Sequence, residues 1–203
     1  MYRCFVWGLF GFVSRSAQCV FLSLDNTLIS IWSKVGTREG LHSAATMFQR
    51  MREDPQNQPD SVTYTTLIHG WSRGVSYLAR LPEAGYRAEQ LLQQLEQLPP
   101  KLQRKDFSPT KVYNSVITAW SRSGEAVAAD KVEDLLSRLE KKYFSGEMNA
   151  QPNKTTFLCM IGAYASARIP DAAARCDALL DRMRYYRNTL GVNNLEQIGR
   201  AHV

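Results

Sequence analysis

The chain has 203 residues, of which 44% are hydrophobic and 22% charged, and lysine plus arginine exceed aspartate plus glutamate by 25 to 19. This composition excludes intrinsic disorder as the default state and allows one domain or one short repeat array with a buried core. The net charge of +6 suits a polyanionic partner, because neutralising phosphates releases counterions, although a basic protein of another function would show the same balance.

The first 21 residues form a segment of their own. An apolar run covers residues 5–13, and arginine but no acidic residue occurs before Asp25. The run is too short to span a bilayer as a helix, so no membrane association is expected. Residues 1–21 are interpreted either as a targeting leader or as an irregular remnant of an earlier repeat helix.

Four later segments share one amphipathic pattern, with apolar residues at i, i+3, i+4 and i+7, which predicts one apolar stripe on a helix. The segments are Ser43–Met51, Arg87–Leu95, Lys131–Leu139 and Arg175–Met183. Their first core positions recur at a constant step of 44 residues and are Ala44, Ala88, Val132 and Cys176. This step indicates an internal repeat.

A second helical segment precedes each of these four. The preceding segments are Asp25–Lys34, Tyr64–Arg73, Tyr113–Arg122 and Phe157–Ser166. Each contains an isoleucine followed three residues later by an aromatic residue, namely Ile29 and Trp32, Ile68 and Trp71, Ile117 and Trp120, and Ile161 and Tyr164. Residues three apart share a helix face, so this stripe is interpreted as core packing rather than as a platform for stacking bases.

Proline precedes a polar residue at the start of three repeats, in Pro59–Asp60, Pro109–Thr110 and Pro152–Asn153. The sequence predicts that Asp60, Thr110 and Asn153 are helix N-caps. Glycines at 36, 74 and 124 are predicted to end the first helix of three repeats, because glycine tolerates positive φ.

The predicted fold class is all-α, an α-solenoid of about four helix–turn–helix repeats. One hairpin cannot bury its own stripes, whereas stacked hairpins share a continuous core. The expected repeats cover about 22–60, 61–109, 110–152 and 153–187, within an array of 22–187, and 188–203 form a tail. Residues 197–203 (QIGRAHV) match a back-translated sequencing-library adapter, so they are expected to be an artefact on a fragment, with a native polar tail as the alternative.

A 44-residue unit alone favours HEAT or armadillo repeats. The strings PDSVTYTTLIHGWSRG and PTKVYNSVITAWSRSG, however, resemble the first helix of the pentatricopeptide repeat, and the A-x-x-L-L-x-x-M/L stripe resembles its second helix. The resemblance covers about 22–187 and implies a right-handed superhelix. The longer unit and Asp25, which stands where the family has an aromatic residue, are departures.

The resemblance implies a protein that recognises single-stranded RNA at roughly one base per repeat through two or three side chains. The main base-recognition position is occupied by Asn26, Thr65, Asn114 and Leu158, and the second position by Asp60, Thr110 and Asn153. In this family an Asn–Asp pair usually favours uracil and an Asn–Asn pair a pyrimidine. Leu158 cannot hydrogen-bond a base edge. Apart from the resemblance, helix capping and local backbone hydrogen bonds explain the polar residues.

Lys34, Arg73 and Arg122 each follow the aromatic residue by two positions, and the resemblance implies that this position faces the RNA backbone. A regular row of cations is what phosphate contacts require. Ser166 interrupts the row. The alternative is that these cations are solvated and favoured by the helix dipole near a C-terminus.

The function expected from the resemblance is an RNA-binding adaptor acting in RNA processing, stability or translation in the mitochondrion, or alternatively the plastid, with other RNA-processing proteins as further partners. The four cysteines and three histidines lack zinc-site or disulfide-framework spacing, so no metal, cofactor or catalytic residue is expected. Two alternatives stay open. One is a helical scaffold that binds protein, and the other is the RNA-binding arm of a larger enzyme, such as a protein-only ribonuclease P, whose catalytic domain is missing.

Overall fold

The computed structural model describes residues 15–73, 81–104 and 107–190. Within these ranges the chain is all-helical, with eight α-helices and two short 3₁₀ helices and no strand. The α-helices are α1 (Arg15–Val35), α2 (Arg38–Glu53), α3 (Ser61–Arg73), α4 (Glu83–Glu96), α5 (Pro109–Ser123), α6 (Ala128–Phe144), α7 (Lys154–Ala167) and α8 (Ala172–Leu190). The 3₁₀ helices are η1 (Pro100–Leu102) and η2 (Met148–Ala150). All eight helical segments expected from the sequence lie inside these α-helices, so the all-α prediction is confirmed.

Local sequence fixes several helix ends. Thr37 caps α2, and its hydroxyl accepts a hydrogen bond from the backbone N–H of Gly40 at 3.1 Å. Two of the predicted glycine stops have positive φ, Gly36 at 70° after α1 and Gly124 at 71° after α5. The third, residue 74, lies outside the described residues. The predicted boundary at 21/22 falls inside α1, which begins at Arg15.

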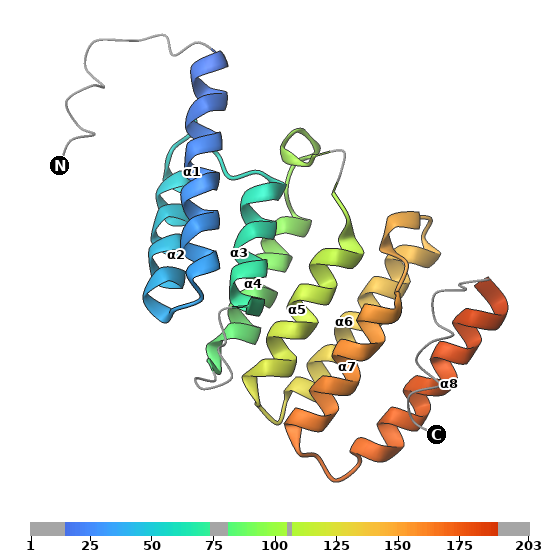
Figure 1. Ribbon diagram of the computed structural model, residues 1–203. Coiled ribbons are helices and arrows are strands. Elements are labelled where there is room, and N and C mark those ends of the chain that lie inside the picture. Colours follow the sequence, from blue (N-terminus) through green and yellow to red (C-terminus); the bar gives the residue numbers. More distant parts are fainter. Residues whose placement is uncertain (1–14, 74–80, 105–106, 191–203) are drawn as a thin grey trace.

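The helices are arranged as four consecutive antiparallel pairs, α1–α2, α3–α4, α5–α6 and α7–α8 (Figure 1). The first helices of the pairs, α1, α3, α5 and α7, pack side by side in chain order. The second helices α2, α4 and α6 lie behind this row, and each contacts its own first helix and the first helix of the next pair. We call the three contacts between consecutive pairs junctions 1, 2 and 3.

One continuous apolar core runs through all four pairs, from Ile29 in α1 to Tyr186 in α8. The aromatic stripe lies in this core. Trp71, Trp120 and Tyr164 are buried, and Trp32 is partly buried against them. Two glycines allow close approach of neighbouring pairs: a Cβ on Gly70 would lie 2.7 Å from Ser33 Oγ, and a Cβ on Gly85 would lie 2.4 Å from Trp120 Cδ2.

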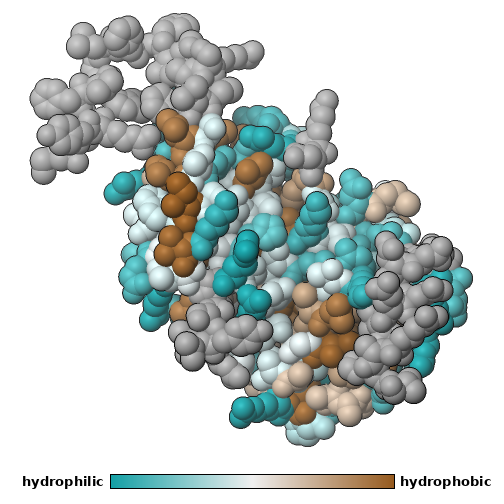
Figure 2. Space-filling view, in the orientation of Figure 1, coloured by the Kyte–Doolittle hydropathy of each residue, from teal (hydrophilic) through white to brown (hydrophobic). Residues whose placement is uncertain are grey.

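The N-terminal end of the core is open on α1. Its outer stripe, Leu24, Leu28, Ile31 and Val35, is 40–58% exposed, and Figure 2 shows hydrophobic side chains along this helix. The corresponding positions of the other first helices are buried against the preceding pair. They are Thr63, Leu67 and Gly70 in α3, Val112, Val116, Ala119 and Ser123 in α5, and Thr156, Met160, Ala163 and Ala167 in α7. The α1 stripe is therefore the same packing surface without a preceding pair among the described residues.

Candidate nucleic-acid interface

At junction 1, three polar side chains form a hydrogen-bonded group that we call the first clasp: Asn26, Asp60 and Thr63. Asp60 precedes α3, and its Oδ1 accepts from the backbone N–H groups of Val62 at 3.1 Å and Thr63 at 3.0 Å. Asn26 Nδ2 donates to Asp60 Oδ1 at 3.5 Å, and Thr63 Oγ1 donates to Asn26 Oδ1 at 2.7 Å. The cap of one helix is thus tied to the preceding first helix.

Junction 3 repeats this arrangement in the second clasp: Asn114, Asn153 and Thr156. Asn153 is the N-cap of α7 in a capping box with Thr156, and its Oδ1 accepts from the Thr156 N–H at 3.2 Å. Asn114 Nδ2 donates to Asn153 Oδ1 at 3.1 Å, and Thr156 Oγ1 donates to Asn114 Oδ1 at 2.7 Å. The structure therefore brings together two of the three residue pairs predicted for base recognition.

Junction 2 does not bring its predicted pair together. Thr65 Oγ1 donates to the Ser61 carbonyl at 2.6 Å, whereas Thr110 Oγ1 faces the carbonyls of Asn149 and Gln151 at 2.8 and 2.9 Å. The prediction that Thr110 is an N-cap is wrong: Ser108 is the cap, and Pro109 opens α5. The physical reason is a spacing of four residues from Pro109 to Tyr113, against five in the other two connectors, together with the preference of proline for the first helical turn.

A small cavity of about 160 Å³ lies between α3 and α5 at junction 2, and its lining includes Thr65, His69, Ser108 and Lys111. His69 Nδ1 lies 2.8 Å from Ser115 Oγ. Burial lowers the pKa of His69, and the neighbouring cations Arg73 and Lys111 lower it further. A neutral imidazole can both donate and accept hydrogen bonds. Neither His69 nor Lys111 was predicted as a site residue, although the short spacing from Pro109 to Tyr113 already distinguishes this junction in the sequence.

The predicted cation row lies in the last turns of α1, α3 and α5. Lys34 and Arg73 are exposed. Arg122 donates from Nη1 to the Ser72 carbonyl at 2.6 Å, so its guanidinium also ties α5 to the end of α3. At the next junction Ser166, which interrupts the row, donates in the same way to the Ser121 carbonyl at 2.6 Å. The row therefore combines exposed cations with contacts between neighbouring helices.

The side chains at the predicted base-recognition positions differ in their exposure and in the contacts that they already make within the protein. Asp60 is buried, and its Oδ2 lies 3.1 Å from Arg104 Nε, so its carboxylate carries an ion pair in addition to the cap. Asn153 is exposed, whereas Asn114 is buried beside it. Leu158, which replaces the asparagine in α7, is 45% exposed. The amide pair at junction 3 therefore differs from Asp60 at junction 1 in having no ion pair among the described residues.

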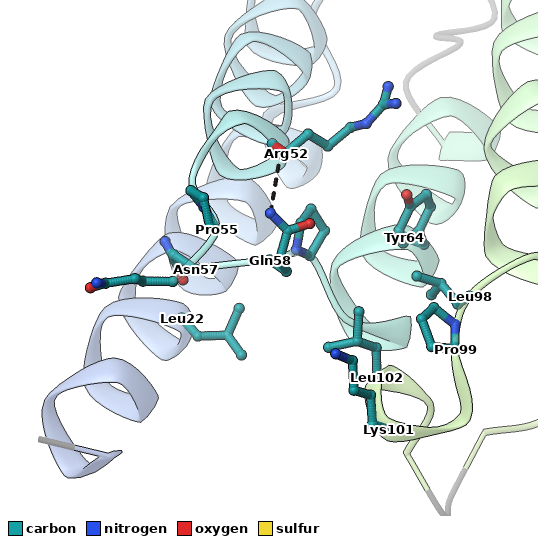
Figure 3. A pocket seen from close by; sticks show the side chains of 12 residues that line it. Leu22, Arg52, Pro55, Asn57, Gln58, Tyr64, Leu98, Pro99, Lys101 and Leu102 are labelled. Carbon is teal, nitrogen blue, oxygen red and sulfur yellow. Dashed lines mark hydrogen bonds between the residues drawn. The ribbon is translucent and has the colours of Figure 1, made fainter. Parts of the chain in front are cut away.

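A larger cavity of about 740 Å³ opens at the edge of junction 1, between the connector that precedes α3 and the segment around η1 (Figure 3). Its walls include the cations Arg52 and Lys101 beside the apolar side chains of Leu22, Leu98 and Leu102. Next to it, Asn57 Nδ2 donates to the buried carboxylate of Asp25 at 2.5 Å. This contact gives a physical reason for a polar residue at position 25.

No protein-family model matches the chain, and no curated protein matches it either. None of the helices within the described ranges is long and apolar enough to cross a membrane. Among the side chains that the structure describes, no group of three or more histidine, cysteine or acidic residues could hold a metal ion.

Proposed function

We propose that the chain is a pentatricopeptide-type α-solenoid of four helix–turn–helix repeats, wound as a right-handed superhelix, that binds single-stranded RNA as an adaptor and not as an enzyme. The proposal extends to a role in RNA processing, stability or translation in the mitochondrion or plastid, alongside other RNA-processing proteins. The repeat assignment draws support from the four equivalent helix pairs and from the matching positions of their buried stripes.

One observation carries the proposal. Asn26 lies against Asp60, and Asn114 lies against Asn153, although 34 and 39 residues separate the partners. These are the pairs that the family resemblance couples in the recognition of one base. An asparagine amide both donates and accepts, so each pair can present a fixed pattern of hydrogen-bonding groups to a base edge. By this pairing, the first clasp favours uracil and the second a pyrimidine.

The test is fluorescence anisotropy of labelled single-stranded RNAs, pyrimidine-rich and purine-rich, with a duplex of the same sequence as a reference. We expect tighter binding to the single strands, a preference for pyrimidines, and loss of that preference in Asn114→Ser. Asn149→Ser, which changes the same residue type in η2 away from the clasps, is the matched control. Equal affinity for all sequences, or an equal effect of both substitutions, would count against base recognition by the clasps.

Salt dependence separates backbone contacts from base contacts. Lys34→Ala and Arg73→Ala should weaken binding to all sequences alike and reduce the slope of log affinity against log salt by about 0.7 for each phosphate that is no longer neutralised. An unchanged slope would remove these two residues from the RNA path while leaving the clasps to be judged by the sequence preference.

A further inference from the structure

Several ion pairs join the second helices α4, α6 and α8, and two of those at each contact recur at equivalent positions. Between α4 and α6, Lys131 pairs with Glu89 at 3.2 Å and Arg138 with Glu96 at 2.6 Å. Between α6 and α8, Arg175 pairs with Glu133 at 3.0 Å and Arg182 pairs with Glu140. Each residue of the second set lies 44 positions after its counterpart in the first. We call these contacts the rungs.

Neither rung exists between α2 and α4. The positions of the two acids are occupied by Ala45 and Arg52, and those of the two bases by Arg87 and Gln94. Arg52 and Arg87 are exposed, and neither forms an ion pair with any residue that the structure describes. One ion pair does cross between these helices near their starts, from Arg38 Nη2 to Glu83 Oε1 at 2.8 Å.

In place of the rungs there is an open groove of about 890 Å³ between α2 and α4. Its apolar lining consists of the buried core residues Phe48, Leu67 and Trp71 together with Ala45 and the partly buried Leu91, and amide groups are supplied by Gln49, Gln90 and Gln94. Gln94 Oε1 is buried and has no hydrogen-bond partner within the described part of the chain. The groove therefore presents the exposed cations Arg52 and Arg87 to solvent, beside side chains that belong to the apolar core.

The chemistry of the lining favours an acidic peptide. Both acids of the groove are already engaged: Glu83 pairs with Arg38, and Glu53 Oε1 accepts from Gln49 Nε2 at 3.1 Å. By the 44-residue step, Arg87 and Ala45 correspond to the first rung, Lys131 and Glu89, and Gln94 and Arg52 correspond to the second rung, Arg138 and Glu96. The two rung positions are seven residues apart on each helix. Seven residues of helix rise about 10 Å, so two carboxylates two turns apart on a partner helix would match both cations. A phosphate chain, charged at every nucleotide, would also meet Glu53 and Glu83.

We propose that the groove between α2 and α4 binds an acidic helical segment of a partner protein, with carboxylates seven residues apart in place of the missing acids of the rungs. Because α2 and α4 lie behind the row of first helices, this surface is separate from the clasps (Figure 1). The inference therefore goes beyond RNA binding and does not rest on it.

The test uses the full chain and a fluorescein-labelled, alanine-rich helical peptide with two glutamates at this spacing, and the same peptide with glutamines as the reference. We expect anisotropy to show binding of the glutamate peptide that weakens with salt. Arg52→Ala and Arg87→Ala should each reduce affinity about two- to fivefold, the range that exposed ion pairs provide. Lys141→Ala, an exposed lysine on α6 outside the groove, is the matched control and should leave affinity unchanged.

A second variant supplies one of the missing acids from the chain itself. Ala45→Glu places an acid opposite Arg87, as Glu89 is placed opposite Lys131, and should weaken the peptide about as much as Arg87→Ala while keeping the helical circular dichroism and melting temperature. Equal binding of the glutamine peptide, or undiminished binding by the Ala45→Glu and Arg87→Ala variants, would overturn the proposal. Competition with single-stranded RNA gives a further check. If the RNA displaces the peptide, and Arg87→Ala also weakens binding of the RNA, the proposal is overturned, because the groove would then be part of the RNA-binding surface.

Discussion

Junction 3 has both kinds of repeated polar contact, a clasp between its first helices and rungs between its second helices, whereas junctions 1 and 2 each have only one of the two kinds. Junction 3 has the second clasp between first helices and two rungs between second helices. Junction 1 keeps a clasp but has no rung, and junction 2 keeps two rungs but has no clasp. The apolar core continues through all three. The apolar core is therefore common to all three junctions, whereas the polar contacts differ from one junction to the next.

The largest expected effect is a break in the packing of junction 2. Gly85→Ala would place a Cβ against the fully buried Trp120 ring, and overpacking of this kind costs about 3 kcal/mol of unfolding free energy. Urea denaturation followed by circular dichroism measures the loss. Gly162→Ala is the matched helical control, because its Cβ would meet only Ser121 Oγ at 3.1 Å. Equal stability of the two variants would contradict the close approach of α4 to α5.

The next effect compares the covered stripe of α3 with the open stripe of α1. Leu67 is 1% exposed and Leu28, its counterpart, is 40% exposed. Leu67→Ala should cost about 2.5 kcal/mol, since it leaves a cavity, and Leu28→Ala less than about 1 kcal/mol. Thermal melts of both variants provide the measurement. A large cost for Leu28→Ala would show that the α1 stripe is covered in solution.

The clasps should contribute a smaller amount. Thr156→Val removes the donor to Asn114 Oδ1 and leaves buried polar groups unpaired, at a cost of about 2 kcal/mol. Junction 2 already has Val112 at this position. Val112→Thr alone should therefore destabilise the protein. Adding Thr65→Asn should recover about 1 kcal/mol of unfolding free energy, because the asparagine supplies a hydrogen-bond partner for the new hydroxyl. A double-mutant cycle measures this coupling, and strictly additive effects would refute it.

The smallest effect concerns pH. The folded protein lowers the pKa of His69 through burial and the neighbouring cations, so in acid the unfolded chain binds more protons than the folded chain. The contribution of neutral His69 is present above its ordinary pKa of 6.5 and is lost as pH falls through that value toward the lowered one. The free energies of unfolding of the wild type and of His69→Gln, measured by urea denaturation at a series of pH values, should diverge over this range. Parallel curves would mean that His69 is not the responsible group.

The sequence was sufficient for the helices because their apolar period is strong and, in the second helix of each pair, recurs every 44 residues. The spacing also predicted Asn153 as the N-cap of α7, whereas its pairing with Asn114 was implied only by the resemblance to the pentatricopeptide repeat. Thr110 was misplaced because one missing residue shifts every side chain in the first turn of α5. The rungs were not predicted, since the partner of Glu89 depends on the relative position of α4 and α6 along their axes, which the sequence pattern does not give. The buried contact of Asp25 with Asn57 was missed for the same kind of reason.

The row of helix pairs also has a mechanical consequence. Each pair contacts its neighbours along the chain, so tension applied to the two ends of the molecule passes through the three junctions in series. Under such a load the weakest junction yields first, and the chain lengthens by one helix pair at a time rather than all at once. In a force–extension record, junction 3 should be the last to give way, because its clasp and its rungs lie on opposite faces and must open together.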